Sequence, residues 1–272
     1  MAELAALIER GGVVVLSGAG ISTDSGIPDY RGDPHRVRRV PITYQEFLRD
    51  ARARRRYWAR SHFGWQRISR ALPNPAHEAV ARLEGDRRVQ GIISQNVDGL
   101  HQAAGSVEVV ELHGSMARTV CLSCGDGRSR LELHHRLEAA NPTMSGAAVE
   151  FAPDGDAELP ERVVDRFVTV DCLACGGVLK PDVVFFGENV ARSVVSDAMR
   201  RVDEASALLV LGSSLTVMSG YRFVLAAHRQ GTPVAIVNRG PTRGDPVAAV
   251  RVEGGLSEIM SSLIDRATPL TA

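Results

Sequence analysis

Four cysteines in two matched pairs carry the clearest chemical signal in the sequence. Cys121 and Cys124 form one Cys-x-x-Cys motif, Cys172 and Cys175 form a second, and a glycine follows each motif. The glycine lets the backbone turn, so that the two sulfurs of a pair can face one ion. Four thiolates complete the tetrahedral shell of Zn²⁺ and leave no position for a substrate, which predicts a structural zinc site. Two disulfides are an alternative, but disulfides are rare in the cytosol. A redox-active Cys-x-x-Cys motif is a further alternative, but it would not require a second such motif.

A glycine turn at residues 18–22, GAGIS, is the second chemical feature. It follows the apolar run VVVLS (13–17), and Ser22 and Thr23 can start a helix after it. Backbone N–H groups of such a turn can face a pyrophosphate, helped by the helix dipole. The third glycine and the downstream acid of a full dinucleotide fingerprint are missing, so a simple tight turn is the alternative. The segment IPDYR (27–31), in which a proline positions an acid, an aromatic and an arginine, favours the nucleotide.

Polar side chains follow a second apolar run, GIIS (91–94). Gln95, Asn96, Asp98 and His101 stand within eight residues of it, where a buried strand should give way to a helix. Such side chains can line the ligand-binding edge of a parallel sheet. We expect His101 to pack or hydrogen-bond on the short helix that follows Asp98. For His113, which follows the next apolar run, a satisfied structural residue is the alternative to a base, because that is the commoner role of a histidine after an apolar strand.

The elements that must position these residues alternate between strands and helices. Strand-like apolar runs occupy residues 13–17, 91–94, 107–112, 207–213, 233–238 and 248–252, with helical patterns between them. This alternation is typical of a parallel sheet that binds its ligand at the strand ends. The sequence predicts the α/β class, with a Rossmann-like doubly wound parallel sheet.

Two regions interrupt this alternation and predict a smaller inserted zinc-binding and helical lobe. Residues 33–73 are rich in arginine and aromatics, and residues 118–178 hold all four cysteines and little strand or helix pattern. We expect a main domain of residues 1–32, 74–117 and 179–272, with a small domain built from the two insertions. The stretch 141–161 resembles a loop, and so long a loop inside a compact domain is usually functional or mobile.

The composition restricts the classes of partner. The 272 residues include 32 basic and 32 acidic side chains, so the formal net charge is zero and does not indicate binding to nucleic acid or to an anionic membrane. No stretch approaches the roughly 20 apolar residues of a membrane span, and the N-terminus lacks the pattern of an export signal. We expect a cytoplasmic protein with small-molecule or protein partners. Lys180 is the only lysine, which we attribute to composition.

The motifs, taken together and in order, closely resemble the sirtuin family from about residue 10 to the C-terminus. Residues 141–161 and GYRF (220–223) further resemble its class II branch, which includes the mitochondrial lipoamidase-type sirtuins. The motifs that carry the resemblance are GAGISTDSGIPDYR (18–31), SQNVDGLH (94–101), ELHGS (111–115), the two Cys-x-x-Cys pairs, KPDVVFFGE (180–188), GSSL (212–215) and NRGPT (238–242).

The resemblance implies NAD-dependent removal of acyl groups from lysine in a protein or peptide, in a cleft between a Rossmann-type and a zinc-bearing domain. The acyl oxygen would attack the ribose as nicotinamide leaves, and an imidazole would then activate the ribose hydroxyls. The products would be lysine, nicotinamide and O-acyl-ADP-ribose. His113 would be the general base, with Asn96 beside it as a catalytic residue.

By the same resemblance, NAD would bind across the ends of several strands. Gln95, Asn96 and Asp98 would line the ribose and nicotinamide pockets, and Tyr30 would shield the reacting ribose from water. The NAD-binding residues implied are Gly18, Ala19, Gly20, Ile21, Ser22, Pro28, Asp29, Tyr30, Arg31, Gln95, Asn96, Val97, Asp98, Gly212, Ser213, Ser214, Asn238, Arg239, Gly240 and Leu256.

The substrate would bind along residues 183–186. We expect Val183, Val184, Phe185 and Phe186 to be extended and to pair with the substrate backbone, the two phenylalanines being candidate walls for the acyl chain. A buried apolar strand is compatible with this role.

Tyr57 and Arg60 have the Tyr-x-x-Arg spacing that binds acidic acyl groups in the class III desuccinylase sirtuins. A phenol and a guanidinium suit a carboxylate. Because arginines crowd the segment, an arginine-rich solvated helix face is the alternative.

Two other functions stay open. A mono-ADP-ribosyltransferase would displace nicotinamide with a side-chain nucleophile, and it would not need the hydroxyl relay through His113. A non-catalytic NAD or ADP-ribose binding module would be signalled by loss of Asn96 or His113, and both are present.

Overall fold

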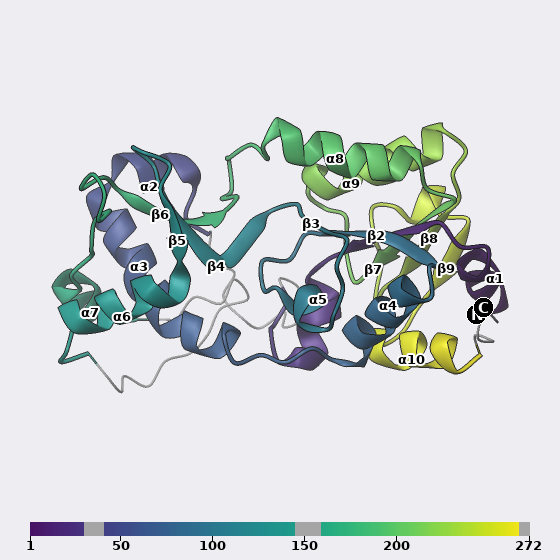
Figure 1. Ribbon diagram of the computed structural model, residues 1–272, viewed down its shortest axis with the longest axis horizontal. Coiled ribbons are helices and arrows are strands. Elements are labelled where there is room, and N and C mark those ends of the chain that lie inside the picture. The colour runs from purple at the N-terminus through teal and green to yellow at the C-terminus, as the bar shows by residue number, and fades with distance from the viewer. Residues whose placement is uncertain (30–40, 145–158, 267–272) are drawn as a thin grey trace. The chain divides into compact units, whose positions relative to one another are not determined.

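The chain forms two compact units, each with a sheet of its own (Figure 1). The computed structural model describes residues 1–29, 41–144 and 159–266. The first unit holds residues 1–26, 72–113 and 190–272, and the second holds residues 27–71 and 114–189. Tyr30 and Arg31, two of the predicted NAD contacts, and residues 145–158 of the loop-like stretch lie outside the described residues.

A parallel sheet of six strands forms the centre of the first unit, which confirms the predicted α/β class. Its order is β3-β2-β1-β7-β8-β9, so counted along the chain the strands run 3-2-1-4-5-6, as in a Rossmann-type fold. The strands are β1 (Val13–Ser17), β2 (Val89–Ser94), β3 (Val109–Glu111), β7 (Ala207–Leu211), β8 (Val234–Val237) and β9 (Val250–Val252). Strands β3, β7, β8 and β9 are shorter than the predicted runs, whereas β2 begins two residues earlier than predicted.

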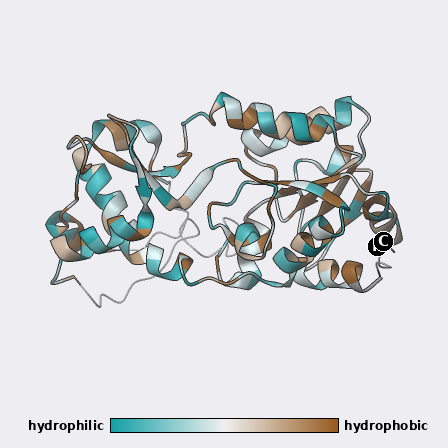
Figure 2. Cartoon of the chain, in the orientation of Figure 1, coloured by the Kyte–Doolittle hydropathy of each residue, from teal (hydrophilic) through white to brown (hydrophobic). Residues whose placement is uncertain are grey.

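Helices cover both faces of this sheet. Val13 and Val15 pack toward α1 (Ala2–Glu9), α4 (Pro75–Gly85) and α10 (Leu256–Arg266), whereas Val14 and Leu16 point to the opposite face. That face is covered by α8 (Arg192–Asp203) and α9 (Met218–Arg229). Successive strand side chains alternate, so a strand between two helical layers is apolar throughout, as the brown strands of Figure 2 show.

In the described part of the chain, no helix is both long and apolar enough to cross a membrane.

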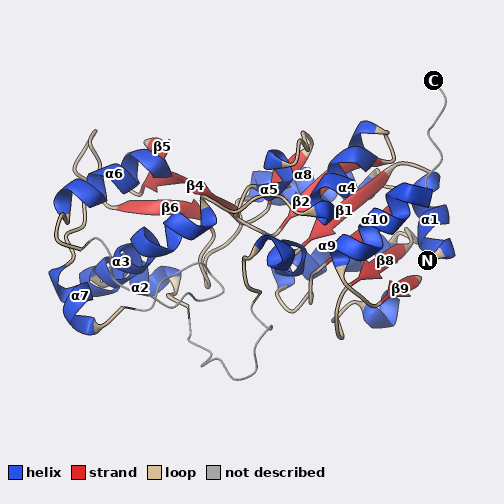
Figure 3. Cartoon of the chain, turned by 90° about the horizontal axis from the view of Figure 1, so that it is seen from below, coloured by secondary structure: helices blue, strands red, loops and turns tan. Residues whose placement is uncertain are grey.

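The second unit contains a small antiparallel sheet with helices beside it. Its strand order is β5-β4-β6, formed by β4 (Gly114–Cys121), β5 (Gly127–Ser129) and β6 (Leu179–Val183). Figure 3 shows α2 (Tyr44–Arg49), α3 (Ala51–Ile68) and α7 (Glu161–Arg166) grouped on one side of β6. Trp58 on α3 ties that helix to the sheet, because its indole N–H donates to the carbonyl of Leu179 at 3.2 Å.

Residues 118–178 contain more regular structure than the sequence predicts. The expectation of little strand or helix pattern was wrong, because β4, β5, α6 (Arg130–Ala140) and α7 fall in this stretch. Ser129 caps α6 by accepting a hydrogen bond from the N–H of Leu131 at 3.1 Å. The helix buries Leu133 and Leu137 together with Arg130 and His134, so its buried face does not show as an apolar periodicity.

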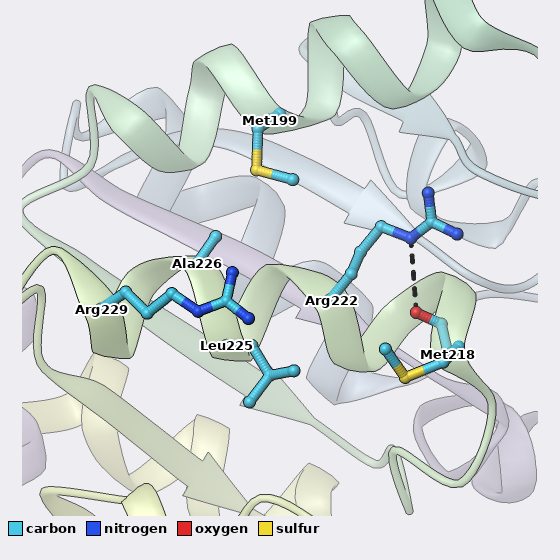
Figure 4. A pocket seen from close by; sticks show the side chains of 6 residues that line it. All are labelled: Met199, Met218, Arg222, Leu225, Ala226 and Arg229. Carbon is cyan, nitrogen blue, oxygen red and sulfur yellow. Dashed lines mark hydrogen bonds between the residues drawn. The ribbon is translucent and has the colours of Figure 1, made fainter.

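A groove between α8 and α9 is lined by thioether, aliphatic and guanidinium groups (Figure 4). Within it, the Nε of Arg222 donates to the carbonyl of Met218 at 3.4 Å. These groups neither transfer protons nor attack carbonyls at neutral pH. The candidate active site therefore lies elsewhere. The lining residues are Met199, Met218, Arg222, Leu225, Ala226 and Arg229.

Candidate active site

The order of the six strands reverses between β1 and β7, which lie side by side. In an open α/β sheet this switch point is where ligands bind, at the carboxyl ends of the strands. Two turns meet there. The first leads from β1 into the 3₁₀ helix η1 (Ala19–Ser25), and the second is the GSSL segment (212–215) after β7.

Glycines allow these two turns to pack backbone against backbone. The N–H of Gly20 donates to the carbonyl of Gly212 at 2.8 Å. A Cβ on Gly18 would lie 2.7 Å from the Cβ of Ser213, and one on Gly212, whose φ is +61°, would lie 2.5 Å from the nitrogen of Ile21. Both approaches are too short for any side chain, so the glycines are required for this packing.

Two amide side chains after β2 hold the turn that follows β1. The Nε2 of Gln95 donates to the carbonyl of Ser17 at 3.1 Å and to the hydroxyl of Ser213 at 2.8 Å. The Nδ2 of Asn96 donates to the carbonyl of Gly18 at 3.1 Å. The structure thus brings together predicted residues from three separate motifs at one end of the sheet.

Asp98 holds the same turn from the other side. Its Oδ2 accepts from the hydroxyl of Ser22 at 2.7 Å, and that hydroxyl accepts in turn from the Nδ2 of Asn96 at 3.1 Å. The other carboxylate oxygen accepts from the N–H of Leu100 at 3.0 Å, at the start of the short helix α5 (Leu100–Ala103). The carboxylate therefore orders both the glycine turn and the helix after it.

His113 lies two residues beyond β3 and makes a hydrogen bond through each ring nitrogen. Its Nδ1 is 2.8 Å from the carbonyl oxygen of Gln95, and its Nε2 is 2.8 Å from the hydroxyl of Ser219. Because a carbonyl oxygen only accepts, Nδ1 carries the proton of the neutral ring and the lone pair of Nε2 receives the Ser219 hydroxyl. This tautomer leaves Nε2 as the basic atom.

Burial lowers the pKa of His113, and the hydrogen bond to Gln95 opposes that shift only in part. The ring is therefore neutral at neutral pH and able to accept a proton at Nε2. Sequence reasoning missed Ser219. It stands next to the GYRF motif at the start of α9, but a serine in the first turn of a helix carries no signal of its own.

His101 has a structural environment. It is buried on α5, its Nε2 lies 2.9 Å from the hydroxyl of Ser17, and its ring centroid is 5.0 Å from that of His77. Burial lowers the pKa of His101 to about 3, so the ring stays neutral. This agrees with the expectation that His101 packs and hydrogen-bonds.

The remaining predicted NAD contacts of the first unit lie after β7 and β8 or at the start of α10. Asn238 is buried and fixes its own turn, because its Nδ2 donates to the carbonyls of Arg239 at 2.8 Å and Gly240 at 3.0 Å. Leu256 packs so close to Gly212 that a Cβ there would lie 2.7 Å from it. Val97 and Ser214 are half-buried in their loops, as are Pro28 and Asp29 in the second unit.

The four cysteines converge in the second unit. All four sulfurs lie within 4.8 Å of one another, with 3.5 Å between those of Cys121 and Cys175 and 3.8 Å between those of Cys124 and Cys172. Sulfurs at about 2.3 Å from a tetrahedral zinc would be separated by about 3.8 Å, so the donor set fits that ion. Backbone N–H groups lower the pKa of Cys121 to about 6, which favours its thiolate.

Glycines shape the backbone around this cluster. Gly125 and Gly176 both have φ above +70°, and their N–H groups donate at 2.9 Å to the carbonyls of the first cysteine in each pair. A Cβ on Gly177 would lie 2.9 Å from the sulfur of Cys121. The arrangement holds two turns with their sulfurs facing one point. None of the four cysteines forms a disulfide, so their sulfurs are available as metal ligands.

The predicted substrate segment begins in β6, which ends at Val183, so only part of residues 183–186 belongs to a strand. Phe185 is buried, whereas Phe186 is half-exposed and forms an isolated parallel bridge with Thr43. Gly114, the residue after His113, pairs with Val183 at a φ of +78°, and a Cβ there would collide with the carbonyl of Asp182. The start of β4 therefore needs glycine.

Tyr57 and Arg60 project from the buried side of α3. The Tyr57 ring is 5.1 Å from that of Phe185 and 5.6 Å from that of Phe47. Arg52 lies on a solvated face of this helix, since it is exposed and pairs with Glu161 at 2.9 Å. The solvated-face interpretation is wrong for Tyr57, which is 7% exposed. The buried Nε of Arg60 has no hydrogen-bond partner in the described ranges.

Comparisons with known proteins agree with this geometry. A model of the Sir2 family matches residues 18–219. The chain is 56% identical to NAD-dependent protein deacetylase 1 of Streptomyces coelicolor, covering 98% of this chain and 89% of that protein. It is 47% identical to the human mitochondrial NAD-dependent protein lipoamidase sirtuin-4, covering 93% and 82%.

Two similar solved structures hold a peptide, and one of them also holds NAD⁺. A Sir2 complex with a p53 peptide and NAD⁺ has a TM-score of 0.78 at 30% identity, covering 97% of each chain. A Sir2 bound to acetylated peptide has a TM-score of 0.78 at 28% identity, again covering 97% of each chain.

Proposed function

The chain belongs to the Sir2 family and is an NAD-dependent protein deacylase, and we propose that His113 is its general base, acting on acyl-lysine in proteins. In this reaction acyl-lysine, NAD and one water molecule give lysine, nicotinamide and O-acyl-ADP-ribose: the bond between nicotinamide and ribose and the amide bond of the acyl-lysine both break, the acyl group is transferred to a ribose oxygen, and water supplies the additional oxygen. The observation that carries the assignment is the fixed tautomer of His113, which directs a basic Nε2 at a hydroxyl group.

The NAD pyrophosphate binds at the turn between β1 and η1. Its support is that the N–H of Ala19, at the start of this turn, makes no hydrogen bond among the described residues. Unpaired N–H groups at a strand-to-helix turn are donors suited to phosphate oxygens. Gln95, Asn96 and Asp98 fix this turn, and NAD-binding roles for the remaining predicted residues form part of the same proposal.

The proton transfer takes place at the Nε2 of His113. A ribose hydroxyl takes the place of the Ser219 hydroxyl and gives its proton to Nε2, which activates the oxygen that receives the acyl group. The carbonyl of Gln95 then stabilises the imidazolium through Nδ1–H, so the ring gains charge without turning. Removing a general base of this kind typically costs about 10²–10⁴ in rate.

The acyl-lysine substrate binds along residues 183–186, at the end of β6. There the chain leaves the ladder of the small sheet, which lets a substrate backbone add beside it. Phe185 and Tyr57 provide a buried aromatic wall for the acyl chain. The Nε of Arg60, which has no hydrogen-bond partner among the described residues, offers a donor for an acyl group that ends in a carboxylate.

The metal held by the four cysteines is Zn²⁺ in a structural role, since four thiolates complete its tetrahedral shell. Bound there, it would crosslink the two cysteine turns beside β4 and β6. Cysteines that are not joined in disulfides are typical of a reducing compartment, which supports a cytoplasmic location.

Nicotinamide release from NAD tests the function directly. Lysine peptides carrying acetyl, lipoyl, long fatty acyl and glutaryl groups are compared with unmodified peptide, using wild type and His113→Ala. We expect acyl-dependent release that His113→Ala lowers by at least about 10²-fold, with NAD binding retained. If no acyl peptide stimulates nicotinamide release, an ADP-ribosyltransferase or a binding module is favoured instead.

The acyl preference is tested by Arg60→Met, which keeps the aliphatic stem but removes the guanidinium. If Arg60 reads an acidic acyl group, this variant loses about tenfold or more in kcat/KM for the glutaryl peptide and keeps its kcat/KM for the acetyl peptide. Equal losses on both peptides would remove Arg60 from the acyl pocket. Arg52→Met, at the exposed ion pair on the same helix, is the matched control.

A further inference from the structure

The only lysine of the chain forms a buried ion pair in the second unit. The Nζ of Lys180 lies 3.0 Å from the Oε2 of Glu188, and the two side chains are 5% and 20% exposed. A buried ion pair contributes little net stability, because the cost of removing two charges from water offsets their attraction. Its presence therefore needs a reason other than stability.

Both charges bind backbone groups of the segment between them. The ammonium of Lys180 donates to the carbonyl of Val183 at 2.5 Å, and the carboxylate of Glu188 accepts from the N–H of Phe185 at 2.9 Å. These two backbone groups stand on either side of Val184. A single ion pair therefore sets the conformation of the chain where it leaves β6.

The same ammonium also fixes an aromatic ring. The Lys180 Nζ is 4.8 Å from the ring centroid of Phe185 and 5.8 Å from that of Tyr44, within the range of cation–π attraction. The N–H of Tyr44 donates to the carbonyl of Phe186 at 2.9 Å. Two aromatic residues and the backbone on both sides of Val184 thus depend on one charged group.

We propose that Lys180 and Glu188 are a positioning pair that presets residues 183–186 to receive the acyl-lysine backbone and aims the Phe185 ring at the acyl chain. The inference rests on the proposed function, which assigns the substrate to this segment. The pair touches no reacting atom, so it acts on substrate binding and leaves NAD binding unchanged.

Steady-state kinetics on four variants test the pair. Lys180→Met keeps the length of the stem without charge, Glu188→Gln keeps an acceptor for the Phe185 N–H, the double variant combines both, and Lys180→Arg keeps the charge. Each single change is expected to raise the KM for acyl peptide by about tenfold, as a lost charged hydrogen bond does, while the KM for NAD changes by less than about twofold.

Two further results distinguish positioning from simple stability. The double variant should lose no more than the worse single variant, because both changes remove one interaction, and Lys180→Arg should recover part of the peptide affinity. Lower melting temperatures with an unchanged peptide KM would show that the pair is only structural and would overturn the inference.

A measurement on the wild type removes any dependence on folded variants. Protein grown with ¹⁵N-lysine carries one labelled side chain, and it is titrated with unlabelled acyl-lysine peptide or with NAD alone. The Lys180 signal should shift and saturate with the peptide but stay in place with NAD. If the Lys180 signal does not move while the peptide is being deacylated, the positioning role is contradicted and the proposed function stands. If the wild type deacylates no peptide, the proposed function itself is contradicted.

Discussion

The Nε2 of His113 and the hydroxyl of Ser219 lie 2.8 Å apart, although 106 positions separate the two residues in the sequence. The basic nitrogen of the ring is therefore engaged by a hydrogen-bond donor. Under the proposed role of His113, a ribose hydroxyl reaches Nε2 only after the Ser219 hydroxyl has turned away. The same proposal predicts that this hydrogen bond opposes NAD binding by roughly the net value of one such bond, about 1 kcal/mol.

Ser219→Ala removes this competition. We expect the variant to bind NAD about fivefold more tightly, because the free enzyme no longer has a hydrogen bond to break. Isothermal titration with NAD in the absence of peptide measures the change directly. Ser219→Thr keeps the hydroxyl and should bind like wild type, and weaker binding by Ser219→Ala would mean that the serine contacts the cosubstrate.

The pH profile of the reaction should report the burial of His113. Burial lowers the pKa of this ring, so the neutral form that accepts the proton persists below the ordinary histidine value of about 6.5. Activity is lost as pH falls through the lowered pKa. In a plot of kcat/KM against pH, the acid limb should therefore have its midpoint below 6.5. A midpoint above that value would contradict the neutral, buried ring.

A methyl group at Gly212 should disrupt the meeting of the two turns. The residue has a φ of +61°, and a Cβ would lie 2.5 Å from the nitrogen of Ile21. Strain and collision together should lower the free energy of unfolding by at least about 2 kcal/mol in Gly212→Ala. Urea unfolding measures the loss, and NAD affinity should fall with it.

Gly85→Ala is the matched control for that change. Gly85 ends α4, and a Cβ there meets nothing within 4 Å. Alanine in this position should leave stability unchanged or raise it by about 0.5–1 kcal/mol. Similar losses in both variants would mean that the cost at Gly212 comes from a general sensitivity to alanine and not from the contact of the turns.

Removal of the metal should unfold the second unit around its cysteines. The purified protein is expected to hold one zinc per chain, and Cys124→Ser should lose it, since three thiolates no longer complete the shell. Elemental analysis gives the stoichiometry, and proteolysis reports the exposed segments. The loss could reach on the order of 10 kcal/mol for the elements that depend on the metal.

Ser123→Ala tests whether the effect is specific to the sulfur. The backbone N–H of residue 123, which bonds the sulfur of Cys121 at 3.4 Å, is kept in this variant. It should therefore retain the zinc and resist proteolysis as wild type does. A Cys124→Ser protein with full zinc content would contradict the four-cysteine site.

Local patterns in the sequence determined the parallel sheet and the pairing of the cysteines. Apolar runs such as 13–17 specify strands that are buried on both faces, since each successive side chain meets a helical layer. The Cys-x-x-Cys turns are fixed by a spacing of three residues and one glycine. Both signals lie within a few residues, so no distant contact is needed to interpret them.

Tertiary structure alone decided the partners of the buried polar groups. Nothing in the sequence around His113 points to Ser219, and Lys180 gave no signal beyond composition until its pairing with Glu188 was seen. Helix α6 was missed for a related reason, because its buried face includes Arg130 and His134. A buried polar group must find a partner, but which residue supplies it depends on the folding of distant segments, and no local pattern records that choice.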